Sequence, residues 1–424
     1  MVKVPRRAET DAVAAGPPAG PVLSPVRLLG LSIFLPSAFM AIGQMALVVV
    51  LPLYIVERGA GVAVAALVFA MRGFGSMLVN VPASVAIARW GHKTSLLCGT
   101  GVMCLAALMV AIASSTWVVG AATLLFGAGM GTWLLARLAY ITEKVPNHQR
   151  GTAMSVLAGL QRLGMLLGPL LGGLGVASVG YRVVFVSIAA SALLTVGLIW
   201  MFVPAAAGRP SQPARPPTST ANGSPAYGLL ALVPRMLRRH RTIFVTAGVF
   251  VFCLQLVREQ RRLLVILWGT TIGIEVDDIG LIVSVASVVD MAMFPVAGYI
   301  MDHRGRKLAG VGCLGILAVA MGLLPLTSTP TSYLFVTVLA GIGNGLGSGI
   351  ILTMGSDLAP ARETSQFLGV WRMVGDLGAF VGPLLTAVAA SLVIALGVSS
   401  IIGLSGAAVL FFCVPETLSS ERHR

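Results

Sequence analysis

The sequence predicts an all-helical membrane protein whose twelve transmembrane helices form two similar halves of six. Hydrophobic residues make up 57% of the 424 residues and charged residues 10%, whereas an average soluble domain has roughly 25% charged residues. Apolar runs recur at the length of about 20 residues that crosses the hydrocarbon core of a bilayer. The two halves also align without gaps at one offset, since Gly305 follows Gly91 by 214 residues, and this indicates an internal duplication.

Six candidate spans lie in each half. They cover 28–56, 63–87, 95–114, 118–142, 152–176 and 183–203, and then 243–268, 279–301, 308–327, 333–356, 366–389 and 393–414. Residues 204–241 form the predicted cytoplasmic linker, because its proline-rich first part cannot bury a core and its last part is a basic segment suited to the membrane surface. The predicted domains are therefore a disordered tail (1–27), a six-helix half (28–203), the linker (204–241), a second half (242–415) and a short tail (416–424).

Basic residues predict the orientation. With both termini in the cytoplasm, most of the 29 Lys and Arg residues lie inside, and only Arg58 and Arg182 lie in outer loops, as the positive-inside rule requires. The acidic loop with Glu275, Asp277 and Asp278 then faces outward. The net charge of +14 is explained by these loops and by anionic lipid rather than by nucleic acid. We expect a monomeric, multi-pass protein of the cell membrane.

A glycine-and-charge motif lies between the spans 279–301 and 308–327. It consists of glycine, three residues, aspartate and a basic cluster: Gly298, Asp302, Arg304, Gly305 and Arg306. It resembles the signature loop of the major facilitator superfamily, in which the glycines allow close helix approach and a tight turn and the aspartate pairs with a base. The first-half copy keeps Arg89 and Gly91 but has Ala88 in place of the aspartate. This loop is the predicted conformational switch.

The span 152–176 resembles the antiporter-associated helix of the same superfamily. Its glycines and proline are Gly164, Gly168, Pro169 and Gly172. Glycines at this spacing give a smooth packing face, and proline kinks the helix. Thr123 stands where drug exporters of the family usually carry an arginine, and Arg137 lies further along the same span. The resemblance implies a transporter of the drug/proton antiporter type.

The span 243–268 carries the densest set of intramembrane charges. Arg258 and Arg262 share one helical face, and Glu259 reaches Arg262 at i, i+3. The resemblance implies that this helix lines the transport cavity. Arg258 and Arg262 would then bind an anionic group of the substrate, and Glu259 would carry a proton. Alternatively, Glu259 and Arg262 neutralise each other, and the arginines extend their charges to the interface.

Two ion pairs between the halves are predicted from depth in the membrane. Arg162 and Asp290 lie near the middle of their spans, and the resemblance places these helices side by side. The same argument pairs Arg72 with Asp376, although Arg372 competes at i−4. Such pairs either couple a proton to movement of the halves or act as permanent contacts. The predicted substrate and proton pathway is Arg258, Glu259, Arg262, Asp290, Arg162, Arg72, Asp376 and Arg137.

These features predict a secondary transporter. The absence of a GxxxxGK[ST] loop argues against an ATP-driven pump, and no arrangement of Ser, His or Cys indicates an enzyme, a metal site or another cofactor. The favoured function is proton-coupled export of amphiphilic small molecules. Uptake or exchange of an organic anion is the second prediction, because arginine exceeds acid inside the spans. A non-transporting sensor or scaffold is the third.

Overall fold

The computed structural model describes residues 29–204, 233–360 and 363–417. Within these ranges, twelve helices are long and apolar enough to cross a membrane, which confirms the twelve predicted spans. The predicted tails and most of the predicted linker lie outside the described residues. The described part of the basic segment is helical at 233–239.

Each half supplies six of the spans. The first half contains η1 (Gly30–Phe34), α2 (Leu35–Glu57), α3 (Val62–Ile112), α4 (Thr116–Lys144), α5 (Asn147–Val179) and α6 (Tyr181–Phe202). The second half contains α8 (Arg241–Ile243), η2 (Phe244–Gly248), α9 (Val249–Thr271), α10 (Val276–His303), α11 (Arg306–Leu323), η3 (Leu324–Leu326), α12 (Pro330–Leu346), α13 (Ile350–Leu358), α14 (Thr364–Val388) and α15 (Leu392–Cys413).

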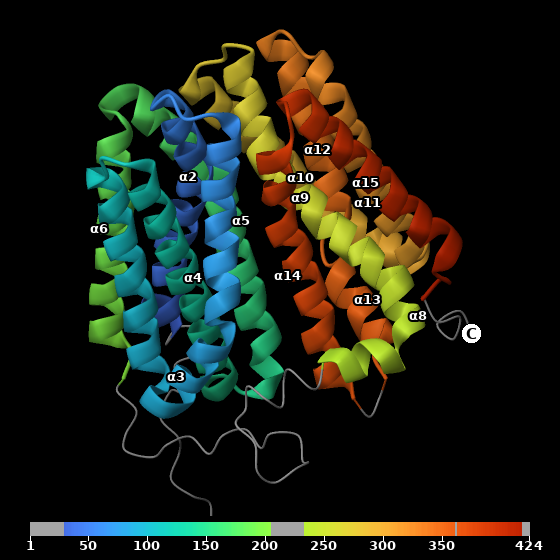
Figure 1. The fold of residues 1–424 in the computed structure, drawn as a ribbon. Helices are drawn as coiled ribbons and strands as arrows, with labels where there is room; N and C mark the ends of the chain where they lie inside the picture. The colour runs from blue at the N-terminus through green and yellow to red at the C-terminus, as the bar shows by residue number, and fades with distance from the viewer. Residues whose placement is uncertain (1–28, 205–232, 361–362, 418–424) are drawn as a thin grey trace, which may run out of the picture.

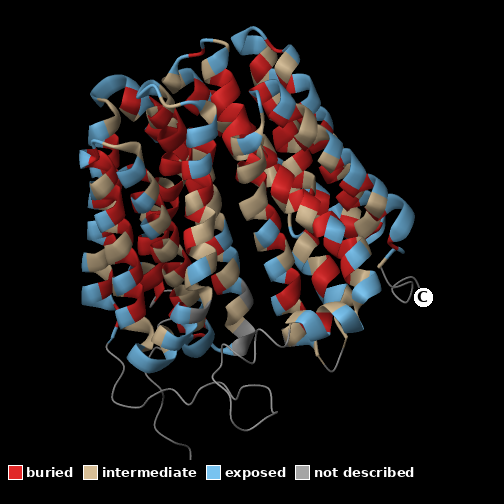
Figure 2. Ribbon diagram, in the orientation of Figure 1, coloured by how far each residue is buried: buried red, intermediate tan, exposed pale blue. Residues whose placement is uncertain are grey.

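The two halves stand side by side as two helical bundles (Figure 1). We call the end where α6 ends and α8 begins the linker end, and the opposite end the far end. Buried residues fill the interior of each bundle (Figure 2), while large apolar side chains such as Trp117 and Phe412 are 84% and 79% exposed on the outside. Such an apolar outer surface is stable only against lipid.

Two glycines with left-handed backbone angles reverse the chain at the linker end. Gly91, with φ 81°, lies inside α3 between its two membrane-spanning segments, which correspond to the predicted spans 63–87 and 95–114. The chain reverses its direction at this residue. Gly305 has φ 104° and joins α10 to α11. Side-chain-bearing residues rarely adopt these angles. The tight turn predicted at Gly305 is therefore confirmed. Gly91, the equivalent residue of the first half, also has a positive φ and forms a turn at the same place in the repeat.

The glycine run of α4 lets this helix approach the backbone of α3. A Cβ added to Gly127 would collide with the carbonyl oxygen of Arg72, and one added to Gly131 would lie 3.0 Å from that of Ser76. The second half repeats this packing, because a Cβ on Gly345 would collide with the carbonyl oxygen of Asp290. Close helix packing through small residues thus places Asp290 of the second half at the height of Ser76 in the first half, one helical turn from the position equivalent to Arg72.

The glycines of α5 pack within the first half. A Cβ added to Gly164 would lie 2.5 Å from the Ala41 backbone, one added to Gly168 would lie 2.5 Å from Met45 Cβ, and one added to Gly172 would lie 3.0 Å from Val50 Cγ2, all on α2. The same helix also carries Pro169 in its interior. The predicted close packing of this helix is therefore confirmed, and its partner is α2.

The halves touch each other near the far end. A Cβ on Gly173 of α5 would lie 2.8 Å from the carbonyl oxygen of Val276 and 3.1 Å from Gly280 Cα, both on α10. In contrast, a Cβ on Gly298, in the linker-end half of α10, would meet nothing within 4 Å. The close helix approach predicted at Gly298 is therefore wrong for this conformation, in which the halves meet at the opposite end of α10.

Candidate transport cavity

A cavity of about 550 Å³ lies between the halves. Its walls come from α2, α3, α4 and α5 of the first half and from α9 and α14 of the second. On α4, which runs toward the linker end, the lining residues extend from Met130 to Leu138. On α5, which starts at the linker end, they extend from Met154 to Met165. The cavity therefore occupies the part of the membrane-spanning helices nearer the linker end, beneath the far-end contact.

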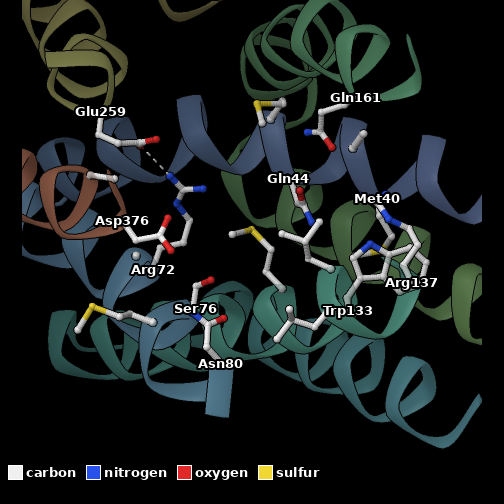
Figure 3. A pocket seen from close by; sticks show the side chains of 18 of the residues that line it. Met40, Gln44, Arg72, Ser76, Asn80, Trp133, Arg137, Gln161, Glu259 and Asp376 are labelled. Carbon is white, nitrogen blue, oxygen red and sulfur yellow. Dashed lines mark hydrogen bonds and ion pairs between the residues drawn. The ribbon is translucent and has the colours of Figure 1, made fainter. Parts of the chain in front are cut away.

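The cavity wall combines flexible apolar side chains with a few polar groups. Six methionines contribute to it: Met40, Met45, Met77, Met130, Met154 and Met165. Phe69, Trp133 and Phe380 add aromatic surface, and Phe380 stacks on Phe74 of the first half with ring centroids 5.2 Å apart. Gln44, Asn80 and Gln161 are among its uncharged polar groups (Figure 3). Such a surface accepts apolar ligands of varied shape.

Glu259 joins the halves at one end of the cavity. Its Oε2 lies 3.3 Å from Arg72 Nη2 of α3, and its Oε1 lies 2.5 Å from Arg262 Nη1 of its own helix. Arg72 is buried and also lies over the Phe69 ring. The predicted i, i+3 contact between Glu259 and Arg262 is confirmed, and Arg72 adds a bond across the halves.

The two ion pairs predicted across the halves are wrong for this conformation. Asp376 lies near Arg72 at the cavity (Figure 3), but its ion pair is with Arg372 of its own helix at 3.8 Å. Arg162 lies over the ring of Phe294 on α10, with 4.0 Å from its guanidinium carbon to the ring centroid. The predicted depths are compatible with contact, but the rotation of each helix about its axis selects other partners.

Asp290 lines a second, smaller cavity of about 60 Å³. The residue is 5% exposed. Its Oδ2 accepts a hydrogen bond from Asn344 at 2.6 Å and lies 3.8 Å from Arg261 Nη2. Among the described residues, its Oδ1 has no hydrogen-bond partner. Thr337, which is 1% exposed, lies on the same cavity wall. A buried acceptor without a partner suits a water molecule or a transferred proton.

The side chain of Arg258, which the sequence predicts as a substrate anchor, contacts the end of α12 in this conformation. It does not line either cavity; its Nη2 donates to the carbonyl oxygens of Gly347 at 2.9 Å and Asn344 at 3.3 Å. These carbonyls belong to the end of α12, where the predicted span 333–356 is interrupted and Gly349 adopts φ 82°. A cation is favourable at a helix C-terminus, where carbonyl groups lack helical partners. Arg258 therefore caps a broken helix.

The predicted switch loop lies at the linker end. Arg306 lies 3.2 Å from Asp357 and 3.4 Å from Asp302, so Asp302 pairs with a base as predicted. Glu416 accepts hydrogen bonds from the backbone N–H groups of Arg306 and Lys307 at 2.8 and 3.1 Å, which caps the start of α11. The side chains of Arg89 and Arg304 are exposed at this end.

Sequence reasoning missed several residues of the two cavities. The six methionines follow no spacing that separates them from the other methionines among the 18 in the chain. Asn344 carried a usable signal, because a polar amide within a glycine-rich apolar span needs a hydrogen-bond partner. Arg261 is the partner of Asp290, and its position one residue from Arg262 places it on a different part of the helix surface.

Comparisons with known proteins agree with this architecture. The family model of the Major Facilitator Superfamily matches residues 33–383 and 262–423. The chain is 25% identical over 351 residues to the multi-drug resistance efflux pump PmrA homolog of Lactococcus lactis, covering 79% of this chain and 81% of that protein. It is also 25% identical over 287 residues to the multidrug resistance protein MdtL of Salmonella paratyphi B, covering 68% and 70%.

A solved structure shows the same fold. It is a POT family transporter in complex with a thioalcohol-conjugated peptide, with a TM-score of 0.75 and 12% sequence identity over 91% of this chain and 95% of that one. The twelve helices, the cavity between two similar bundles and the family match lead to one conclusion. The chain belongs to the Major Facilitator Superfamily, whose members are membrane transporters and not enzymes.

Proposed function

We propose that this transporter exports amphiphilic, drug-like small molecules across the cell membrane by alternating access, driven by a proton gradient. The observation that carries the proposal is the cavity of about 550 Å³ between the halves, with its six methionines and its charged ends. Multidrug resistance relatives at 25% identity support the substrate class. The basic residues of the predicted cytoplasmic loops support a cytoplasmic linker end. The conformation described here then opens inward.

Methionine explains how one cavity accepts many compounds. Its unbranched side chain has several rotatable bonds and a polarisable sulfur, so that it adapts to ligands of different shape. The aromatic rings of Phe69, Trp133 and Phe380 provide stacking surfaces for planar groups. The wall therefore favours apolar ligands without fixing one geometry.

Glu259 is the carboxylate best placed to couple a proton to transport. It forms ion pairs with Arg72 of the first half and with Arg262 of the second. Protonation of Glu259 would remove the negative charge that both arginines contact. Removing one partner of a fully buried ion pair costs about 3–5 kcal/mol, and the cost here is smaller because 15% of the Glu259 side chain is exposed. A proton on Glu259 would therefore release the inter-half contact and favour a rearrangement of the two bundles.

Transport in everted membrane vesicles tests this proposal. We expect wild-type vesicles with an acidic interior to accumulate a lipophilic fluorescent dye, because dye leaves the cytoplasmic face as protons move the other way. Glu259→Gln should lower gradient-driven accumulation at least tenfold while keeping downhill dye exchange. Glu363→Gln is the matched control, since Glu363 also pairs with an arginine, Arg239 at 2.5 Å, but lies outside the cavity.

Three outcomes would count against parts of the proposal. Absence of flux of any dye in either direction would favour the sensor or scaffold hypothesis. Dye flux that ignores the pH gradient in wild type would exclude proton coupling. Full gradient response in Glu259→Gln would exclude Glu259 as the coupling residue.

A further inference from the structure

We infer that the cavity binds amphiphilic organic anions and that Arg137 holds their anionic group. The inference rests on the proposed transport function and defines its substrate class. It starts from a difference among the four arginines that line the cavity. Three of them pair with carboxylates: Arg72 and Arg262 with Glu259, and Arg372 with Asp376.

Arg137 is the fourth of these arginines, and it has no carboxylate partner among the described residues. Its Nη1 donates to the hydroxyl oxygen of Ser37 at 3.2 Å. Its guanidinium carbon lies 5.7 Å from the centroid of the Trp133 ring. No carboxylate of the described chain pairs with it within 4.0 Å. Arg137 therefore carries a positive charge whose neighbours are one hydroxyl group and one aromatic face.

An unpaired arginine inside a transmembrane helix costs several kcal/mol unless water or a ligand solvates it. The guanidinium of Arg137 has five N–H donors, and in the described part of the chain the Ser37 hydroxyl accepts a hydrogen bond from Nη1 alone. The remaining N–H groups suit a planar or tetrahedral anion, because the guanidinium fork binds carboxylate and phosphate oxygens in pairs. The chemistry available at Arg137 therefore selects a carboxylate, sulfonate or phosphate.

The position of Arg137 defines the rest of the ligand. Figure 3 shows Arg137 and Trp133 at one end of the cavity and Arg72, Glu259 and Asp376 at the other. Met40 lies beside Arg137 (Figure 3), and further methionines line the wall between the two ends. A ligand bound through Arg137 would thus lay an apolar body along the methionines. Its anionic group must therefore be attached to a largely apolar skeleton.

The net charge of the cavity points to the same class. Four arginines and two carboxylates line it, so positive charge is in excess even when both carboxylates are ionised. In a site of reduced dielectric, this excess attracts an anion and repels a cation more strongly than the same charges do in water. A permanently cationic amphiphile would contact the same apolar wall, but the excess positive charge would weaken its binding.

Binding to the purified protein tests the inference without any transport step. The probes are pyrenebutyrate, its methyl ester and pyrenebutyl-trimethylammonium, which share one apolar body. We expect wild type to bind the carboxylate at least tenfold more tightly than the ester, since a hydrogen bond to a charged group contributes about 1.5–3 kcal/mol. Arg137→Ala should reduce this preference to within about twofold. Arg137→Lys should keep part of it, because the charge remains and the fork is lost.

Equal affinity of wild type for the acid and its ester would overturn the inference, and this comparison needs no variant to fold. An unchanged preference in Arg137→Ala would also overturn it. Gradient-driven transport of a neutral dye by wild type is measured separately. If that transport is present and the carboxylate preference is absent, the substrate class is wrong and the transport function stands; if both are absent, the transport function fails too.

Discussion

His92 and Glu143 in the first half occupy the positions that Arg306 and Asp357 occupy in the second. His92 Nε2 lies 2.5 Å from Glu143 Oε2, and Arg306 Nε lies 3.2 Å from Asp357 Oδ2. The repeat has therefore kept a base and a carboxylate at the linker end of each bundle. The first half carries a histidine where the second half carries an arginine, whose charge is permanent.

We predict that His92→Arg stabilises the first half. Arginine carries a permanent charge and five N–H donors, and it pairs with a carboxylate at the equivalent place in the second half. The melting temperature of His92→Arg should exceed that of wild type. The effect is below about 1 kcal/mol, because Glu143 is partly exposed.

The reciprocal variant is the control. Arg306→His should lower the melting temperature, because it removes the charged partner of Asp357. Equal melting temperatures for His92→Arg and wild type would contradict the prediction.

Asp290→Asn should abolish pH-gradient-driven accumulation and lower stability. The substitution removes the only carboxylate that the described chain places within 4.0 Å of Arg261, and leaving a buried charge unpaired costs about 3–5 kcal/mol. Dye accumulation and thermal unfolding are measured on the same preparation. Transport at the wild-type level would exclude a coupling role for Asp290.

A double variant separates the two effects of this substitution. Asp290→Asn combined with Arg261→Gln removes both charges and should recover stability without recovering gradient-driven accumulation. Recovery of both would show that Asp290 only neutralises Arg261.

Arg258→Ala should reduce stability and leave the charge preference for substrates in place. Its guanidinium caps the carbonyl end of α12 and does not line the large cavity. Loss of hydrogen bonds from a charged donor costs about 1.5–3 kcal/mol. Thermal unfolding and binding of pyrenebutyrate and its ester measure the two properties. A loss of carboxylate preference with unchanged stability would return Arg258 to the role of substrate anchor that the sequence predicts.

Gly173→Ala should weaken the far-end contact between the halves. The added methyl group would lie 2.8 Å from the Val276 carbonyl oxygen, closer than a carbon and an oxygen pack without strain. Labelling of a cysteine introduced at the buried position Val49, by an impermeant maleimide from the far end, should become faster. Gly159→Ala is the control on the same helix, because its Cβ would meet nothing within 4 Å. Equal labelling rates in the two variants would contradict the prediction.

The sequence predicts the parts of this molecule that depend on composition and spacing. Apolar length is enough to place twelve spans, and a glycine inside a charged loop is enough to place the turn at Gly305. Which buried charged residues pair with each other depends on the rotation of each helix about its axis and on the contacts between the halves. The depth of a residue in the membrane determines neither of these. Arg162 and Asp290 are both near mid-helix, yet Arg162 stacks on Phe294 and Asp290 binds Asn344.

The interruption between α12 and α13 has no counterpart at the equivalent position of the first half. In the second half, Gly349 adopts φ 82° between two shorter helices. The equivalent position in the first half is Leu135, within the 29 continuous helical residues of α4. Leucine does not adopt a positive φ without strain, so α4 has no joint at this height. The first bundle therefore has a continuous α4, whereas the equivalent part of the second bundle is divided at Gly349 into α12 and α13.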